Sequence, residues 1–224
     1  MEYPKINSLF KRREDHSFII GDYSCPEFEL IKRWRVEEKI DGTNVRIIYD
    51  PNTENEKITI LGRSKDSGMP TYLVDFLKNH FTVDLLHRVF GESKYKLVLF
   101  GEGYGHTIQS AGPQYRKDVS FMLFDIHVGS FWLTREVVKE KAELLQVPFP
   151  PDLGIMTEEE IVQFIHTKPN SRCSITPQVI EGIIARPEPL LLFRNGKPLM
   201  WKLKVRDFYD EGKTCQEVKT IVNI

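Results

Sequence analysis

Alternating and apolar runs near the start of the chain predict strands. Residues 34–39, 44–50 and 57–63 have the pattern of short strands, and residues 44–50 are rich in the β-branched residues that favour a pleated, half-buried surface. Pro51 and Asn52, two residues common in turns, stand between the last two segments. The pattern therefore predicts one strand over residues 34–39 and a β-hairpin over residues 44–63.

The middle of the chain changes to a helical period. Between residues 72 and 90 the apolar side chains recur three or four positions apart, at Leu73, Phe76, Leu77, Phe81, Leu85 and Val89. Gly91 follows, and glycine often ends a helix because it tolerates the left-handed conformation. We expect one helix over residues 72–90.

Two more helices are indicated by their start signals. Residues 134–146 begin at Thr134, a favourable N-cap, and the helical pattern stops before Pro148. Residues 157–166 begin with Thr157 and carry Glu160 three positions later, which is the pattern of a capping box.

Four further segments have the apolar character of buried strands: residues 95–101, 119–128, 179–186 and 198–206. Strands thus dominate both ends of the chain, with helices between them. This order favours an α+β fold built on antiparallel sheets with flanking helices, rather than a repeated βαβ unit.

Composition narrows the class of protein. With 41% hydrophobic and 28% charged residues the chain can bury a sizeable core and is not a disordered composition. The formal net charge is -1, so there is no general basic excess of the kind common in duplex-binding proteins. A nucleic-acid surface, if present, must be a local patch.

No targeting, membrane or metal-ribbon signal is visible. The three cysteines have no CxxC spacing, the first residues contain no apolar signal core, and no apolar run approaches a membrane span. We expect a reduced, soluble, cytoplasmic protein that is a monomer and has no membrane partner.

Residues 38–44 carry the first candidate chemistry. Lys39, Asp41 and Gly42 lie between two predicted strands, where Gly42 permits a tight turn with positive φ. A lysine before such a turn sits at the rim of a sheet, and its neutral amine is a good nucleophile. By itself the segment is also typical of an ordinary polar turn.

Lys39-Ile40-Asp41-Gly42 resembles the nucleotidyl-acceptor motif of the superfamily that contains DNA ligases, RNA ligases and mRNA capping enzymes. Asn44 stands where DNA ligases typically carry arginine, so the segment is similar to the type-2 branch of ATP-dependent RNA ligases. The resemblance implies an ATP-grasp-like nucleotidyltransferase domain in which Lys39 accepts AMP from ATP. It also implies that Glu38, Ile40 and Asn44 contact the nucleotide.

Three more segments resemble motifs of this superfamily, in the family's order. Arg63, at the end of a predicted strand, is similar to an arginine that contacts the nucleotide, although a strand-end arginine is usually only solvated. Glu102, between Gly101 and Gly103, resembles the glutamate that binds the ribose. In the segment 121–126 the resemblance implies that Phe121 stacks on adenine, and we expect Phe124 to be a core residue.

The last two motifs are Glu181 to Arg186 and Trp201 to Lys204. On a strand, residues two apart share a face, so Lys202 and Lys204 present two ammonium groups to one side. The resemblance implies that these lysines contact the phosphates and act with Lys39 in catalysis. It also implies that Glu181 contacts the nucleotide, and that Asn44 and Glu181 hold Mg²⁺, or Mn²⁺ in its place, through water.

The resemblance covers residues 34–206, and about twenty residues follow Lys204. We therefore expect a single adenylyltransferase domain over residues 1–224, without the OB or helical C-terminal domain of relatives. The expected partners are ATP and RNA, including a nicked duplex or an RNA/DNA hybrid, and the expected reaction joins 5′-phosphate and 3′-hydroxyl ends. The alternatives are a minimal DNA ligase or another polynucleotide nucleotidyltransferase, and a non-catalytic nucleotide-binding module.

Overall fold

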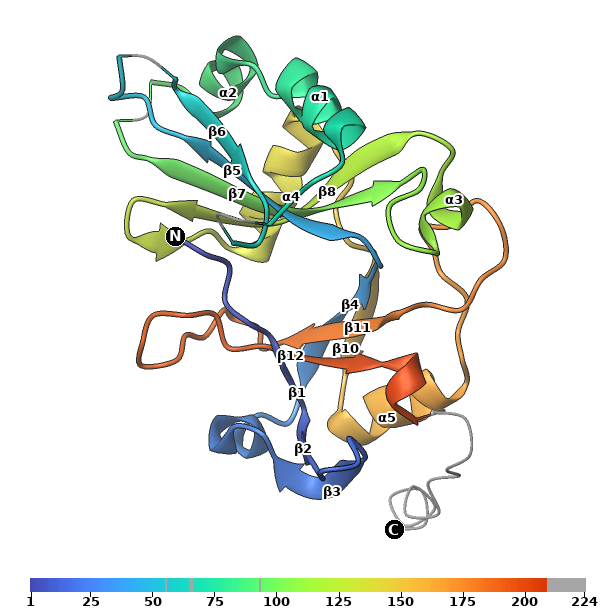
Figure 1. The fold of residues 1–224 in the computed structure, drawn as a ribbon. Coiled ribbons are helices and arrows are strands. Elements are labelled where there is room, and N and C mark those ends of the chain that lie inside the picture. The colour runs from blue at the N-terminus through green and yellow to red at the C-terminus, as the bar shows by residue number, and fades with distance from the viewer. Residues whose placement is uncertain (55, 65–66, 93, 209–224) are drawn as a thin grey trace. The chain divides into compact units, whose positions relative to one another are not determined.

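The computed structural model describes residues 1–54, 56–64, 67–92 and 94–208, and contacts divide the chain into two compact units (Figure 1). The first unit comprises residues 1–3, 41–150 and 174–176, and the second comprises the rest. The boundary falls between Ile40 and Asp41, inside the motif that contains Lys39. The expectation of a single adenylyltransferase domain stays a prediction.

The first unit is built on a five-stranded antiparallel sheet with the strand order β6-β5-β7-β8-β9. The predicted hairpin over residues 44–63 is confirmed as β5 and β6. The bounds of the strands are β5 (Thr43–Tyr49), β6 (Ile58–Leu61), β7 (Leu97–Gly105), β8 (Val119–Val128) and β9 (Phe131–Trp132).

Helices cover one face of this sheet (Figure 1). The predicted helix over residues 72–90 is two helices, because the chain leaves helical geometry at Phe81 and Thr82. The Thr82 hydroxyl then accepts a hydrogen bond from the Leu85 amide, 3.2 Å away, and caps the second helix. The helices of this unit are α1 (Thr71–His80), α2 (Val83–Phe90), α3 (Gly112–Tyr115) and α4 (Arg135–Leu144).

The second unit contains a five-stranded sheet with the order β1-β12-β11-β4-β10. All its pairs are antiparallel except that of β1 with β12. The α+β class with antiparallel sheets is confirmed, with this one parallel pair as the exception among the described strands. The bounds are β1 (Asn7–Ser8), β4 (Trp34–Lys39), β10 (Asp152–Met156), β11 (Gly182–Arg186) and β12 (Trp201–Lys204).

A second small sheet, one α-helix and two 3₁₀ helices complete the described part of this unit. The capping box at the start of α5 is confirmed, because Thr157 and Glu160 exchange both hydrogen bonds. The bounds are β2 (Phe10–Arg12), β3 (Phe18–Tyr23), α5 (Glu158–His166), η1 (Pro26–Leu30) and η2 (Val205–Phe208). None of the helices in the described ranges is long and apolar enough to cross a membrane.

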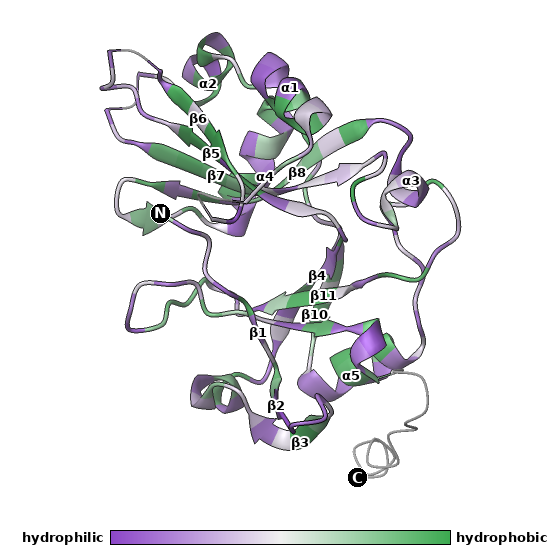
Figure 2. Cartoon of the chain, viewed as in Figure 1, coloured by the Kyte–Doolittle hydropathy of each residue, from purple (hydrophilic) through white to green (hydrophobic). Residues whose placement is uncertain are grey.

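Strand alternation separates the two faces of the second unit's large sheet. Val36, Ile183 and Leu203 are fully buried in the hydrophobic core. The alternate positions on β4 and β12 are charged and point to the opposite face, among them Lys39 and Lys204. Figure 2 shows the same mixture of hydrophobic and hydrophilic residues along these strands. The sheet therefore presents lysines on a face that its core does not occupy.

Candidate functional site

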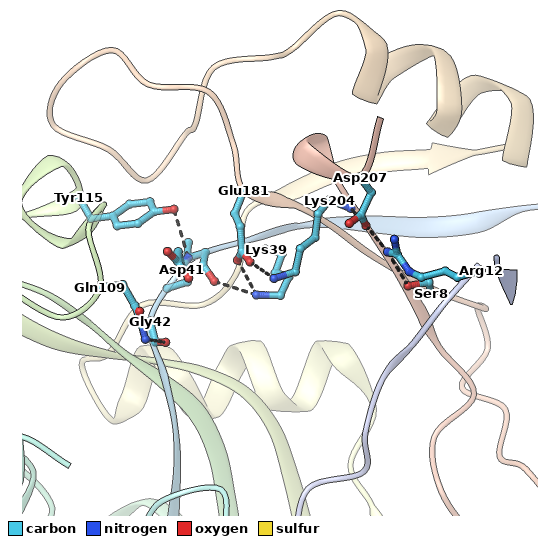
Figure 3. Close-up of polar contacts among 11 residues, drawn as sticks. Ser8, Arg12, Lys39, Asp41, Gly42, Gln109, Tyr115, Glu181, Lys204 and Asp207 are labelled. Atoms are coloured by element: carbon cyan, nitrogen blue, oxygen red, sulfur yellow. Dashed lines mark hydrogen bonds and ion pairs between the residues drawn. The ribbon is translucent and has the colours of Figure 1, made fainter. Parts of the chain in front are cut away.

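A cluster of two lysines and one glutamate lies on this charged face (Figure 3). The Lys39 Nζ is 2.5 Å from one carboxylate oxygen of Glu181, and the Lys204 Nζ is 2.5 Å from the other. The Lys39 Nζ also donates to the Ile40 carbonyl, 3.2 Å away. All three charged side chains are mostly buried, so mutual pairing offsets the cost of removing them from water. We call these residues the lysine–glutamate cluster.

The register of three strands brings the cluster together. Lys39 on β4 is opposite Gly182 on β11, and Gly182 is opposite Lys204 on β12. A Cβ atom on Gly182 would lie 2.1 Å from the Leu203 carbonyl oxygen, so the middle position accepts no side chain. The absence of that side chain lets the two lysines converge on the Glu181 carboxylate, which precedes β11. This steric demand explains the glycine that follows Glu181.

Lys202 lies two positions before Lys204, on the same face of β12. The expectation that these lysines share a face is confirmed, because the intervening Leu203 is fully buried in the core. Across the sheet, Lys202 is in register with Ile184 of β11. With two lysines and one carboxylate, the lysine–glutamate cluster carries net positive charge, and Lys202 adds to it. Such a face suits an anionic ligand.

Glu38 points to the face of β4 opposite to that of Lys39, where its side chain is buried. Its carboxylate accepts hydrogen bonds from the Ser171 hydroxyl at 2.5 Å and from the Arg172 amide at 2.8 Å. Burial raises the pKa of Glu38 above its ordinary value, and these two hydrogen bonds oppose that effect. Burial also raises the pKa of the nearby Cys173 thiol to about 12. The nucleotide contacts expected of Glu38 and Ile40 stay predictions, and no sequence signal had indicated Ser171.

The first unit holds the turn that follows Ile40. The Asp41 amide donates to the Tyr115 hydroxyl at 3.2 Å, and the Gln109 side-chain amide donates to the Gly42 carbonyl at 3.1 Å (Figure 3). Gly42 does not use the positive φ that glycine permits. Glycine is required there because a Cβ atom would lie 2.4 Å from the Gly103 carbonyl oxygen.

Asn44 and Glu102 are neighbours in the sheet of the first unit. They are paired in register on β5 and β7 and point to the same face. The Asn44 Oδ1 atom is buried and has no hydrogen-bond partner in the described part of the chain. An amide oxygen in this state fits a ligand donor or a metal-bound water. Arg63 lies exposed beyond the end of β6, and its expected nucleotide contact stays a prediction.

The structure contradicts the expected role of Phe121. Its side chain is fully buried in the core under the helices and packs edge-on against Phe81, with the ring centroids 5.3 Å apart. The ring also fills the space beside Gly101, where a Cβ atom would lie 2.2 Å from it. Strand alternation therefore places Phe121 on the face opposite to Glu102, and it is a core residue rather than a stacking platform.

Phe124, which we expected in the core, is partly exposed. A β-bulge lies beside it, because Phe100 is opposite Asp125 whereas Gly101 is opposite Leu123. The bulge shifts the alternation of β8, and the Phe124 ring lies 4.8 Å from that of Tyr3. The roles of the two phenylalanines are thus exchanged with respect to burial.

The described residues contain no group of three or more His, Cys, Asp or Glu side chains that could hold a metal ion. Mg²⁺ does not demand such a cage, since it commonly keeps several waters and binds one or two carboxylates together with substrate phosphates. Asn44 in the first unit and Glu181 in the second each carry an oxygen donor of the kind that suits Mg²⁺ bound mainly by phosphate and water.

Comparisons with known proteins agree with the resemblance. A family model described as RNA ligase matches residues 32–204. A solved structure of a Naegleria gruberi RNA ligase with PPi is 17% identical, with a TM-score of 0.62, and the match covers 95% of this chain and 58% of that one. A mutant of that ligase with AMP and Mn is 17% identical, with a TM-score of 0.63 and coverages of 96% and 59%.

A further mutant of the same ligase, with ATP and Mn, is 17% identical with a TM-score of 0.61, over 91% of this chain and 56% of that one. The chain therefore spans less than two thirds of the length of these solved structures. Among curated proteins no significant match is found.

Proposed function

Because the chain belongs to the RNA ligase family, we propose that it is an ATP-dependent RNA ligase that works through a covalent Lys39–AMP intermediate. The observation that carries the proposal is the lysine–glutamate cluster. Lys39, the residue that resembles the family nucleophile, shares the Glu181 carboxylate with Lys204, from the last motif of the family. The similar Naegleria gruberi structures contain ATP, AMP or PPi, which are the reactants and products of lysine adenylation.

In the first step the Lys39 Nζ attacks the α-phosphorus of ATP. A nitrogen–phosphorus bond forms, the bond from that phosphorus to the pyrophosphate oxygen breaks, and pyrophosphate leaves. The amine must lose a proton before or during the attack. Glu181 is the carboxylate placed to accept it, because its oxygen lies 2.5 Å from the Nζ atom.

Phosphoryl transfer needs little covalent help from a protein, so catalysis rests on positioning and charge neutralisation. Lys204 and Lys202 supply fixed positive charge for the α-phosphate. A divalent cation, Mg²⁺ or Mn²⁺, would neutralise further phosphate charge and favour pyrophosphate as a leaving group. The assignment of Asn44 and Glu181 as its water-mediated ligands, and of Glu102 to the ribose, remains part of this proposal.

In the later steps AMP moves from Lys39 to a 5′-phosphate, and a 3′-hydroxyl then displaces AMP to form the phosphodiester. The family assigns RNA as the polynucleotide, as single strands, a nicked duplex or an RNA/DNA hybrid. A monomer in the cytoplasm is the expected state of the protein.

The test is incubation with radiolabelled ATP or GTP, each with Mg²⁺ or Mn²⁺, followed by a denaturing gel. We expect label from ATP alone, in a bond that is broken by acid and stable to base, as a phosphoramidate is. Label from GTP alone would indicate a guanylyltransferase, and no label would indicate a non-catalytic binding module. Sealing of a nicked DNA but not of a nicked RNA by the labelled protein would favour a DNA ligase.

Because Phe121 is buried and Phe124 is partly exposed, a second prediction concerns which of them stacks on the base. We propose Phe124, the partly exposed ring, as the base-stacking residue. Phe124→Ala should weaken ATP binding about 5- to 150-fold, because stacking on an aromatic contributes about 1–3 kcal/mol. Phe121→Ala should instead destabilise the fold by about 3–5 kcal/mol, the usual cost of removing a buried aromatic ring.

The measurements are ATP titration by calorimetry and thermal unfolding, on both variants in parallel. Phe124→Leu serves as the control, because it retains apolar volume while losing the ring. If Phe121→Ala folds normally and loses ATP affinity, while Phe124→Ala binds ATP as well as the unaltered protein, the exchanged assignment is wrong.

A further inference from the structure

Beyond the segment matched by the RNA ligase model, residues 32–204, two charged residues meet at the end of β12. Arg12 comes from the last position of β2, and Asp207 comes from η2, the 3₁₀ helix that follows β12. The Arg12 Nη2 atom lies 2.9 Å from the Asp207 Oδ2 atom (Figure 3). The Asp207 side chain is only 11% exposed, so this pair is not an ordinary surface ion pair.

The same Asp207 oxygen contacts the backbone of a cluster lysine. The Lys204 amide donates to Oδ2 over 3.2 Å. The next amide, that of Val205 at the start of η2, donates to the Glu181 carbonyl just before β11, so the Lys204 amide points away from β11. On that side β1 pairs only with Trp201 and Lys202. The Asp207 carboxylate thus takes the place of a missing strand at Lys204.

Arg12 is itself firmly held. Its Nη1 atom donates to the His16 carbonyl at 2.8 Å, and its guanidinium lies 4.2 Å from the centre of the Phe18 ring. Its Nη2 atom also lies 3.4 Å from the hydroxyl of Ser8, which is paired with Lys202 across β1 and β12. An arginine fixed at several points presents a rigid partner to Asp207.

We infer that Arg12 and Asp207 are positioning residues for Lys204. Together they fix the backbone at the end of β12, and through it the direction from which the Lys204 ammonium reaches Glu181. The inference rests on the proposed function for its catalytic consequence, and it adds to the site two residues outside the part of the chain that carries the family motifs.

The catalytic consequence is a loss of rate rather than of ATP binding. Asp207→Ala removes the acceptor of the Lys204 amide and the partner of Arg12, and displacement of a catalytic group by about 1 Å can cost about a hundredfold in rate. We expect the single-turnover rate of adenylation at saturating ATP to fall by about tenfold to a hundredfold. The ATP concentration that gives half the maximal rate should change far less.

Graded and matched variants separate positioning from general damage. Asp207→Asn keeps an oxygen for the Lys204 amide, and Arg12→Lys keeps a positive partner for Asp207. The adenylation rates of both variants should therefore lie between the rate of Asp207→Ala and that of the unaltered protein. The double variant Arg12→Ala, Asp207→Ala should adenylate only slightly more slowly than Asp207→Ala alone, because the two side chains act as one pair. The control is Asp22→Ala, which removes an exposed ion pair with Lys11 in the same unit and should leave the rate unchanged.

A second readout needs no ATP. The unliganded protein is treated with limiting acetylating reagent, and the modification of Lys204 is compared with that of Lys96, an exposed lysine in the other unit, by peptide mass spectrometry. Lys204 is paired with Glu181 and mostly buried, so it should react slowly in the unaltered protein. Its relative reactivity should rise about fivefold in Asp207→Ala, the change expected when a site loosens by about 1 kcal/mol, and should stay constant in Asp22→Ala.

The two readouts distinguish failure of the inference from failure of the proposed function. If the unaltered protein forms no adenylate but Lys204 becomes reactive in Asp207→Ala, the positioning role stands and the ligase proposal falls. Unchanged Lys204 reactivity in folded Asp207→Ala, whatever the adenylation rate, overturns the positioning role. Circular dichroism establishes folding, and Asp207→Asn decides the matter if the alanine variant does not fold.

Discussion

Replacement of Lys39 by alanine is expected to abolish covalent labelling of the protein by ATP while preserving the fold. The Lys39 Nζ atom is the proposed nucleophile, and the labelled bond cannot form without it. Stability should change little, because Glu181 keeps its ion pair with Lys204 and is not left as an unpaired buried charge. The measurements are radiolabel incorporation on a denaturing gel and thermal unfolding of the same preparation.

Two companion variants sharpen this result. Lys39→Arg keeps a positive charge beside Glu181, but a guanidinium stays protonated in proteins and cannot act as the nucleophile, so it too should not label. Lys32→Ala is the matched control, because Lys32 is in the same unit and its ammonium donates to the Glu29 carbonyl, 3.1 Å away, rather than to the lysine–glutamate cluster. Label that persists in Lys39→Ala would show that another residue is the nucleophile.

The elements predicted from the hydrophobic pattern agree with the structure where that pattern is clear or where a helix cap marks the start of the element. The strands over residues 34–39 and 119–128 have the predicted bounds, and the capping box at Thr157 starts α5. The predicted helix over residues 72–90 failed at Thr82, because the apolar period continues unbroken across a new N-cap.

The strands β1, β2 and β3 were not predicted. β1 and β2 are only two and three residues long, and β1 pairs with a strand far along the chain. Ser8, for example, is paired with Lys202 near the other end of the described chain. A window of neighbouring residues contains no trace of such a contact. This limit also hid Arg12 and Asp207, whose proximity depends on that pairing.

For the candidate site, spacing predicted which lysines share a face, and resemblance predicted which residues matter. Neither predicted that Gly182 aligns Lys39 with Lys204, because register between strands is a tertiary property. The resemblance likewise could not show which face of β8 Phe121 takes, because that face depends on its pairing with Gly103 of β7. The bulge beside Phe124 is also a property of strand pairing, and nothing in that apolar segment marks where a bulge falls.

Lys204→Ala is expected to reduce the rate of Lys39 adenylation by about a hundredfold to a thousandfold, the usual cost of removing one group that stabilises charge in a transition state. The Lys204 ammonium is fixed 2.5 Å from Glu181 before any ligand is bound, so its charge needs no reorganisation during the reaction. The measurement is single-turnover adenylation at saturating ATP. Lys202→Ala should also be severely slowed, because Lys202 lies on the same face of β12.

Lys204→Arg should restore little of the lost rate, although it restores the charge. The guanidinium is planar and wider than an ammonium, whereas the Lys204 Nζ atom occupies a mostly buried position on a carboxylate that it shares with Lys39. The control is Lys197→Ala, an exposed lysine of the same unit, which should adenylate normally. Full activity in both Lys204→Ala and Lys202→Ala would mean that this face of β12 takes no part in the reaction. If Lys204→Arg is fully active while the two alanine variants are slow, the side chain at position 204 is needed only for its positive charge and not for its size and geometry.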